Sequence, residues 1–101
     1  MGTILYTHAD SFGHDPGRMH PEHPARLKAV LTALSAEEFN GLERREAPRA
    51  AVEQIARAHP LDYVEAILEA VPETGERPID GDTVMSPGTG DAILRSSGAV
   101  C

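Results

Sequence analysis

The sequence predicts an α/β fold in which short strands alternate with amphipathic helices. Residues 3–7 (TILYT) are β-branched and aromatic, as is typical of a strand, and residues 42–48 (LERREAP) are expected to form a second short strand. Apolar residues recur at helical spacing in the segments between and after these strands. Two short strands do not make a stable sheet, and the apolar helix faces need a sheet to cover. The elements therefore predict half of an α/β layer structure.

The first helix is expected to follow a long loop. Residues 8–23 carry glycine or proline at positions 13, 16, 17 and 21, which predicts a loop. Pro24 suits the first turn of a helix, where no backbone N–H is needed. The apolar stripe of this helix ends before the Asn40-Gly41 break and consists of Leu27, Val30, Leu31 and Leu34.

Three more helices are predicted in the second half of the chain. Residues 50–58 (AAVEQIARA) have a helical pattern, which His59-Pro60 interrupts before Pro60 starts the next helix. Residues 72–83 are rich in acids and turn formers, which predicts a loop. Ser86-Pro87 is a good pair for an N-cap and a first helical turn, so residues 86–101 are expected to form a helix that has not finished at Cys101.

Composition narrows the possible functions. The chain has 101 residues with two Phe, two Tyr and no Trp, so little apolar area is available and a chain of this size is expected to be marginally stable alone. A formal net charge of -7 argues against nucleic-acid binding, which needs a basic patch. The single cysteine, Cys101, excludes an intrachain disulfide. No signal peptide or membrane-spanning run is visible, so a cytoplasmic protein is expected.

One candidate site is the stretch of residues 14–27 (HDPGRMHPEHPARL), whose first part, residues 14–23, we call the histidine loop. Its histidines do not have the spacing of a helical H-E-x-x-H motif, so a metal site built only from this loop is not expected. A hydrogen-bonded loop is the favoured interpretation. The residues that could still act as zinc ligands are His14, His20, His23, Asp10, Asp15 and Glu22.

Three other candidates have two interpretations each. Asp80 and Asp82, in the sequence DGDT, form either a binding pair or an acidic turn, and the turn is favoured on residues alone. Arg26 lies two residues past Pro24 in the first turn of the helix. It is either a surface arginine, which the pattern favours, or an inward-pointing one with its planar guanidinium fixed by backbone groups.

Four segments together resemble a known family. HPEHPARLKAVLTAL is similar to the H-P-E-x-P-x-R-L segment of the zinc-dependent histone deacetylases, especially the class II and bacterial branch with acetylpolyamine amidohydrolases and acetoin-utilisation proteins. LYTHADSFGHD resembles the first strand and first long loop of that family, and His59 to Tyr63 its H-x-x-x-Y segment. DTVMSPGTGDAILRSSGAV resembles the stretch that opens a long helix. The four segments follow the order of the family and span essentially the whole chain.

The resemblance implies that residues 1–101 are a partial deacetylase-like domain: the N-terminal third, truncated, of a three-layer arginase/deacetylase-type α/β fold with a parallel sheet. No H-H pair and no D-x-H occurs in this sequence. The resemblance therefore implies that the catalytic histidines and the zinc ligands lie beyond residue 101. The intact protein is expected to hydrolyse acetyl-lysine or acetylpolyamine-type amides with zinc, and residues 1–101 alone are expected to be inactive.

Supporting residues are carried over by position. Arg26 matches the arginine that the family places in an inner cavity below the metal, so the resemblance favours its inward orientation, and Tyr6 resembles a residue near that cavity. The resemblance also implies that His20, Pro21 and Glu22 form part of the rim of the substrate channel. Some members place a substrate-anchoring acid in the loop that here contains Asp80 and Asp82.

A non-enzymatic module is the alternative interpretation. In this view the chain is a small acidic protein that folds by associating with itself or with a partner. The apolar helix faces motivate it, because they exceed what a soluble monomer usually exposes. On either interpretation we expect a homo-oligomer, with no nucleic-acid or membrane partner.

Overall fold

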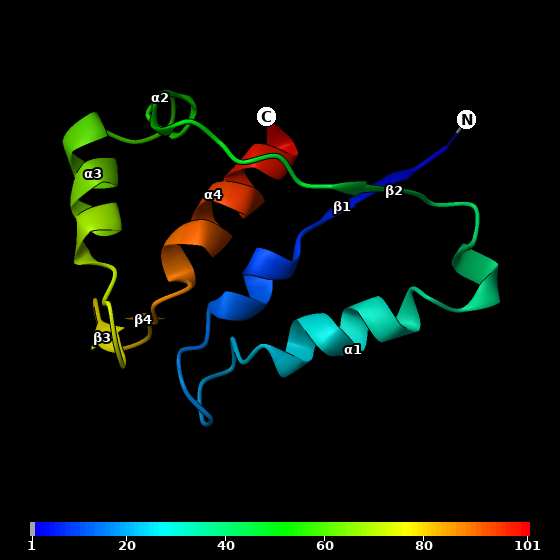
Figure 1. The fold of residues 1–101 in the computed structure, drawn as a ribbon, viewed down its shortest axis with the longest axis horizontal. Coiled ribbons are helices and arrows are strands. Elements are labelled where there is room, and N and C mark those ends of the chain that lie inside the picture. The colour runs from blue at the N-terminus through cyan, green and yellow to red at the C-terminus, as the bar shows by residue number, and fades with distance from the viewer. Residues whose placement is uncertain (1) are drawn as a thin grey trace.

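The computed structural model describes residues 2–101 (Figure 1). Helix α4 occupies the centre of the view, with the strand pair β1–β2 beside it and α1 along the lower edge. In chain order the elements are β1 (Ile4–Thr7), the 3-10 helix η1 (Ala9–Gly13), α1 (Ala25–Ala33), the 3-10 helix η2 (Glu37–Phe39), β2 (Glu43–Glu46), α2 (Val52–Ile55), α3 (Leu61–Ala70), β3 (Arg77–Pro78), β4 (Val84–Met85) and α4 (Thr89–Val100).

The two predicted strands are confirmed, and they pair in parallel. The register runs from Ile4 opposite Glu43 to Thr7 opposite Glu46. Residues of β1 alternate between exposed and half-buried, whereas all four residues of β2 are exposed. Because neither strand has a buried face, the sheet holds together through its ladder and through the elements around it.

Helix α4 joins segments that are far apart in the sequence. Its Arg95 donates from Nε to the Asp10 carboxylate at 3.1 Å and from Nη1 to the Ala47 carbonyl oxygen at 3.1 Å. The backbone N–H of Ala50 donates to the Leu94 carbonyl oxygen at 2.9 Å. One helix therefore fixes both η1, which follows β1, and the segment that follows β2.

Gly98 makes this close approach possible. A Cβ atom added at Gly98 would lie 1.7 Å from the carbonyl oxygen of Pro48 and 3.0 Å from the backbone nitrogen of Ala50. Backbone atoms of Pro48 and Ala50 thus occupy the space in which any other residue has its side chain. The glycine at position 98 is explained by this contact.

Several predicted boundaries differ from the structure. The predicted loop of residues 72–83 contains β3, which pairs in antiparallel fashion with β4 to form a hairpin. The predicted helix of residues 50–58 is helical only over Val52–Ile55. Within the predicted loop of residues 8–23, Ala9–Gly13 form the 3-10 helix η1.

The start of α4 also differs from the prediction. The helix begins at Thr89 with Gly88 as its N-cap, and Ser86 is not the cap. The Ser86 hydroxyl has other partners, because it donates to the Gly13 carbonyl oxygen and accepts from the backbone N–H of Asp15, both at 2.8 Å. The Ser86 side chain, which the local sequence predicts to cap the helix, thus forms hydrogen bonds with a distant segment instead.

The buried core is small. Its apolar members are Ala47, Ala50, Val64, Met85 and Ala92. The accessible surface is 7019 Å², against about 5,500 Å² expected for a compact monomer of this mass. The radius of gyration is 15.0 Å, against about 13 Å for a compact chain of this length. The chain is therefore flatter and more open than an isolated compact domain.

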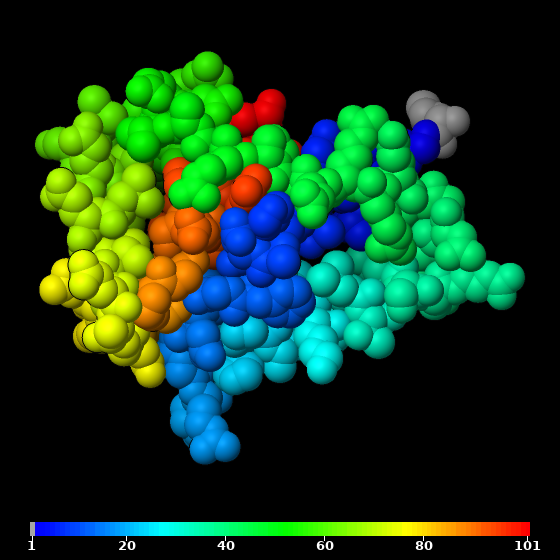
Figure 2. Space-filling model, in the orientation of Figure 1, coloured from blue at the N-terminus to red at the C-terminus, as the bar shows by residue number. Residues whose placement is uncertain are grey.

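Helix α1 shows this openness most clearly. It has no buried residue, and Val30, in the middle of its predicted apolar stripe, is 53% exposed. The histidine loop that precedes it protrudes at the lower edge of the molecule, with Met19 96% exposed (Figure 2). Across residues 2–101, no helix combines the length and the apolarity needed to traverse a bilayer.

Two glycine variants of α4 test the packing contact. We expect Gly98→Ala to lower the free energy of unfolding by about 1–3 kcal/mol, because the new methyl group clashes with backbone. Gly90→Ala is the matched control, since a Cβ there meets only a Val71 methyl group at 3.5 Å. It should leave stability unchanged or raise it by up to about 1 kcal/mol through helix propensity. Urea unfolding followed by circular dichroism measures both, and equal stabilisation by the two alanines would contradict the contact.

Candidate functional site

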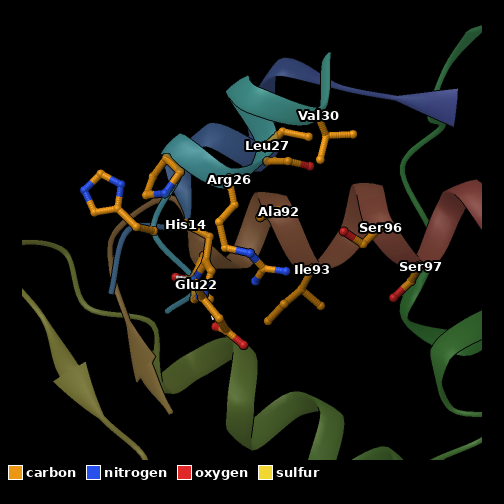
Figure 3. Close-up of a pocket in the computed structure, with 13 residues that line it drawn as sticks. His14, Glu22, Arg26, Leu27, Val30, Ala92, Ile93, Ser96 and Ser97 are labelled. Carbon is orange, nitrogen blue, oxygen red and sulfur yellow. Dashed lines mark hydrogen bonds and ion pairs between the residues drawn. The ribbon is translucent and has the colours of Figure 1, made fainter. Parts of the chain in front are cut away.

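The candidate site lies where the histidine loop and α1 face α4 (Figure 3). A pocket of about 660 Å³ opens there. Arg26 and Leu27 of α1 line one side, Ile93 of α4 lines the other, and His14 and Glu22 lie at one end. The structure therefore places the HPEHPAR segment next to α4, which begins within the SPGT sequence. The order of these motifs along the chain does not show that they are neighbours.

His14 connects the two halves of this pocket. Its Nδ1 lies 2.7 Å from the hydroxyl oxygen of Thr89, and its Nε2 lies 2.9 Å from a carboxylate oxygen of Glu22. The hydrogen bond from His14 holds the pKa of the Glu22 carboxyl below its ordinary value; burial opposes this shift, and the nearby side chains of His14, His20 and Arg26 add to it. Glu22 is thus an anion near neutral pH, and His14 Nε2 is the donor of that bond.

The Thr89 hydroxyl, which is bonded to His14, is buried. Thr89 is 4% exposed, and its hydroxyl oxygen accepts the backbone N–H of Ser86 at 2.8 Å. Gly13 and Gly88 touch through their backbones beside it, since a Cβ at Gly88 would lie 2.4 Å from the Gly13 carbonyl oxygen. Because the backbone of Gly13 packs against that of Gly88, His14 and Thr89, which follow them in the sequence, are held side by side.

Arg26 combines features of both of its predicted orientations. Its side chain extends from α1 across the pocket toward Ile93 (Figure 3). It is nevertheless exposed, and its Nη1 donates to the Pro21 carbonyl oxygen at 3.4 Å. The guanidinium is therefore oriented by a loop carbonyl while it lines the pocket.

The predicted rim residues meet at a second pocket. This pocket, of about 740 Å³, lies between the histidine loop and the β3–β4 hairpin, and His20, Pro21, Glu22 and Asp82 line it. The Nε2 atom of His20 lies 2.5 Å from the carbonyl oxygen of Asp82. Of the two acids in the sequence DGDT, Asp82 lines this pocket and Asp80 does not.

Asp80 stabilises the turn instead. Its carboxylate accepts the backbone N–H of Asp82 at 2.8 Å. This bond, with further hydrogen bonds from Thr83, lowers the pKa of Asp80 below its ordinary value. The acidic turn, which the sequence favours for both acids, describes Asp80.

Tyr6 lies away from both pockets. It is on β1 opposite Arg45, and it is exposed. The pKa of Arg45 is raised, chiefly by a hydrogen bond to Glu43 and further by Tyr6. In residues 2–101 alone, Tyr6 therefore has a neighbour on the sheet and no part in the pocket that contains Arg26.

Zinc, which the resemblance implies, does not fit the described residues. Within residues 2–101, no three side chains of His, Cys, Asp and Glu lie close enough to hold a metal ion. The ring nitrogens of His14 and His20 face hydrogen-bond partners in the loop, in α4 and in the hairpin. We therefore derive no chemical step through a metal at this site.

Sequence reasoning missed the role of Thr89 and the pairing of His14 with it. These two residues are 75 positions apart, so no local pattern connects them. The only signal was the SPGT sequence itself, in which Thr89 stands three residues after Ser86. It was interpreted as helix capping.

The chain is similar to known proteins in sequence and in fold. Residues 20–101 match the family described as the histone deacetylase domain. An uncharacterized protein of Synechocystis sp. is 32% identical over 91 residues, which are 86% of this chain and 29% of that protein. The crystal structure of the HDA15 HD domain has a TM-score of 0.78 at 16% identity, covering 98% of this chain and 30% of that one. This likeness confirms the predicted α/β fold, and the chain spans about three tenths of each protein.

The buried hydroxyl of Thr89 can be tested by removing it. Thr89→Val keeps the shape of the side chain but leaves the Ser86 N–H and His14 Nδ1 without their partner, so we expect a loss of about 1–3 kcal/mol in the free energy of unfolding. Thr32→Val, at an exposed position of α1, is the matched control and should change stability by no more than about 0.5 kcal/mol. Urea unfolding measures both. Equal small effects would show that the Thr89–His14 bond contributes nothing to stability.

Proposed function

The chain belongs to the histone deacetylase domain family, and on that premise we propose that residues 1–101 are the N-terminal part of a zinc-dependent amidohydrolase. The HPEHPARL segment supports the class II and bacterial branch, with acetylpolyamine amidohydrolases and acetoin-utilisation proteins. In this proposal the intact protein is cytoplasmic and hydrolyses acetyl-lysine or acetylpolyamine-type amides. Residues 1–101 contribute part of the domain and of its substrate channel.

The observation that carries this proposal is the position of Arg26. It lies on the wall of the pocket between α1 and α4, and the Pro21 carbonyl orients its guanidinium. A planar guanidinium can hold a carboxylate through two parallel hydrogen bonds. Leu27 and Ile93 line the same pocket and offer apolar surface for a methyl group. A pocket of this chemistry suits acetate, the product of deacetylation.

The zinc ligands and the histidine pair of the family are proposed to lie outside these residues. His20, Pro21, Glu22 and Asp82 then form part of the channel rim, and Arg26 part of the inner cavity. Tyr6 joins the cavity in this proposal only if further strands and loops are placed beside β1. The chemistry of the metal is supplied by residues that this sequence does not contain.

An activity assay tests the division of roles. Residues 1–101, supplied with zinc, should not hydrolyse acetyl-lysine peptides or acetylpolyamines, because the catalytic groups are absent from their sequence. A full-length family member serves as the positive control. Clear turnover by residues 1–101 would contradict the proposal. The coding sequence after Cys101 gives an independent test, since an H-H pair followed by D-x-H supports the enzyme and a stop codon supports the alternative.

The alternative, a self-associating module, is favoured by one observation. The surface of the chain exceeds that of a compact monomer by about 1,500 Å², estimated from 7019 Å² against the expected value. An excess of this size on one chain is about twice the roughly 800 Å² that each partner buries in a standard-size interface. In this proposal a second copy covers the apolar stripe of α1 and the pocket beside it.

Sedimentation velocity tests self-association of residues 1–101. We expect the chain to sediment as a homo-oligomer, because the apolar stripe of α1 is only partly covered within one chain and is stabilised when a second copy covers it. Val30→Asp, within the stripe, should shift the distribution toward the monomer, whereas the control Met19→Asp, in the exposed loop, should leave it unchanged. A well-folded, compact monomer of the unaltered chain would contradict the expectation.

A further inference from the structure

The hydrogen bonds of His20 define its protonation state. Its Nδ1 lies 3.1 Å from the backbone nitrogen of Glu22, which can only donate, and its Nε2 lies 2.5 Å from the carbonyl oxygen of Asp82, which can only accept. Both bonds form together only if Nδ1 is without a proton and Nε2 carries one. The docked loop therefore requires the neutral ring, in one tautomer.

These two bonds connect separate parts of the molecule. Glu22 belongs to the histidine loop, and Asp82 lies in the turn of the β3–β4 hairpin, 62 positions away from His20. A second proton on His20 would turn Nδ1 into a donor that faces the donor N–H of Glu22. The ring then has to turn away from the Glu22 N–H. Because this rotation also moves Nε2, the hydrogen bond from His20 to the Asp82 carbonyl oxygen is lost.

His14, in the same loop, tolerates a second proton. Its Nε2 already donates to the Glu22 carboxylate, and its Nδ1 faces the hydroxyl of Thr89, which can either donate or accept. When Nδ1 gains a proton, the Thr89 hydroxyl can accept it, because the Ser86 hydroxyl lies 3.3 Å away as an alternative partner for the hydrogen of Thr89. Acid therefore preserves the contact between the loop and α4.

Charged side chains from the loop and from the hairpin side surround the ring of His20. Glu22 and Arg18 face the same pocket from the loop, and Glu76 and Asp82 face it from the hairpin side. Three carboxylates against one guanidinium give a net negative environment, which offers acceptors to the second ring N–H. The hydrogen bonds of the docked loop thus fit only the neutral ring, and carboxylate acceptors for a doubly protonated ring lie nearby once the ring has turned.

We propose that His20 is a pH-sensitive latch, which in its neutral form holds the histidine loop against the β3–β4 hairpin and in its protonated form releases it. The docked loop binds one proton fewer than the released loop, so lower pH favours release. Imidazole is the side chain type whose charge changes between about pH 5 and pH 8, so the release is to be measured in that range. The latch concerns the position of the loop and does not rest on the proposed enzymatic function.

Spin labels on the two sides of the pocket can measure this release. Met19→Cys and Gly81→Cys place labels on the loop and on the hairpin, and Cys101→Ser removes the native thiol. Met19 is almost fully exposed and an added Cβ at Gly81 meets nothing within 4 Å, so both positions accept a side chain. We expect a narrow distance distribution at about pH 7.5 and a broader, longer one at about pH 5.5. Dilution with unlabelled chain keeps the measurement intramolecular in an oligomer.

The pH window isolates histidines. The pKa of Glu22 and that of Asp80 are both lowered from their ordinary values, so these carboxylates stay ionised throughout the window. His20→Gln, whose amide can donate to Asp82 without titrating, should keep the distribution equally narrow at both pH values. His59→Gln, at an exposed site whose ring lies beside that of Tyr63, is the matched control and should behave like the unaltered labelled chain.

Three outcomes would overturn the latch. Identical distributions of the labelled chain at both pH values would show that the loop is not released. Release at low pH that persists in His20→Gln would assign the effect to another histidine. A parallel loss of helical circular dichroism at about pH 5.5 would mean general unfolding. The labelled chain with native His20 is sufficient for the first and third outcomes, so failure of the Gln variant to fold leaves the proposal open to refutation.

Discussion

The contact of α4 with two backbone segments is the constraint on which the rest of this structure depends. Gly88 meets Gly13 at the start of the helix, and Gly98 meets Pro48 near its end, in both cases with backbone atoms where a Cβ would stand. Contact this close is possible only for glycine, and it brings main-chain donors and acceptors within reach of the helix. The Ala50 N–H and the Leu94 carbonyl use it for a hydrogen bond between backbones. With so small a buried core, these contacts determine where β1 and β2 lie relative to the helix.

The same contact determines the geometry of the candidate site. Because Gly13 is held against Gly88, the next residue, His14, is placed beside Thr89 in the first turn of α4. The hydrogen bond between His14 and Glu22 then positions Glu22, and the loop between these two residues turns back on itself. Gly17 permits this turn, because its φ of 114° is a backbone conformation that favours glycine. A Cβ atom added at Gly17 would also lie 3.1 Å from the Glu76 carboxylate. The pocket that contains Arg26 is thus a consequence of backbone packing several residues away.

Local signals predicted the strands and most helices, whereas contacts between distant residues decided the rest. Pro60 before α3 and the β-branched run of β1 act within a few residues, so their effects are visible in the sequence. Ser86 has the local signature of an N-cap, but its hydroxyl bonds to Gly13 across 73 positions. The resemblance pointed to Arg26, which lines the first pocket, and only the fold could separate Asp82, which lines the second pocket, from Asp80. No pattern within the sequence could show that His14 and Thr89 meet.

The histidines illustrate why residue type alone does not define a metal site. Zinc needs ring nitrogens with available lone pairs that converge on one point. Here Nδ1 of His20 accepts a backbone N–H, as do Nδ1 of His8 and of His23, each from the residue two positions later. Nε2 of His14 is directed at a carboxylate instead. The lone pairs of these three rings are used one at a time by a nearby backbone N–H, so these histidines stabilise local turns and do not converge on a metal ion.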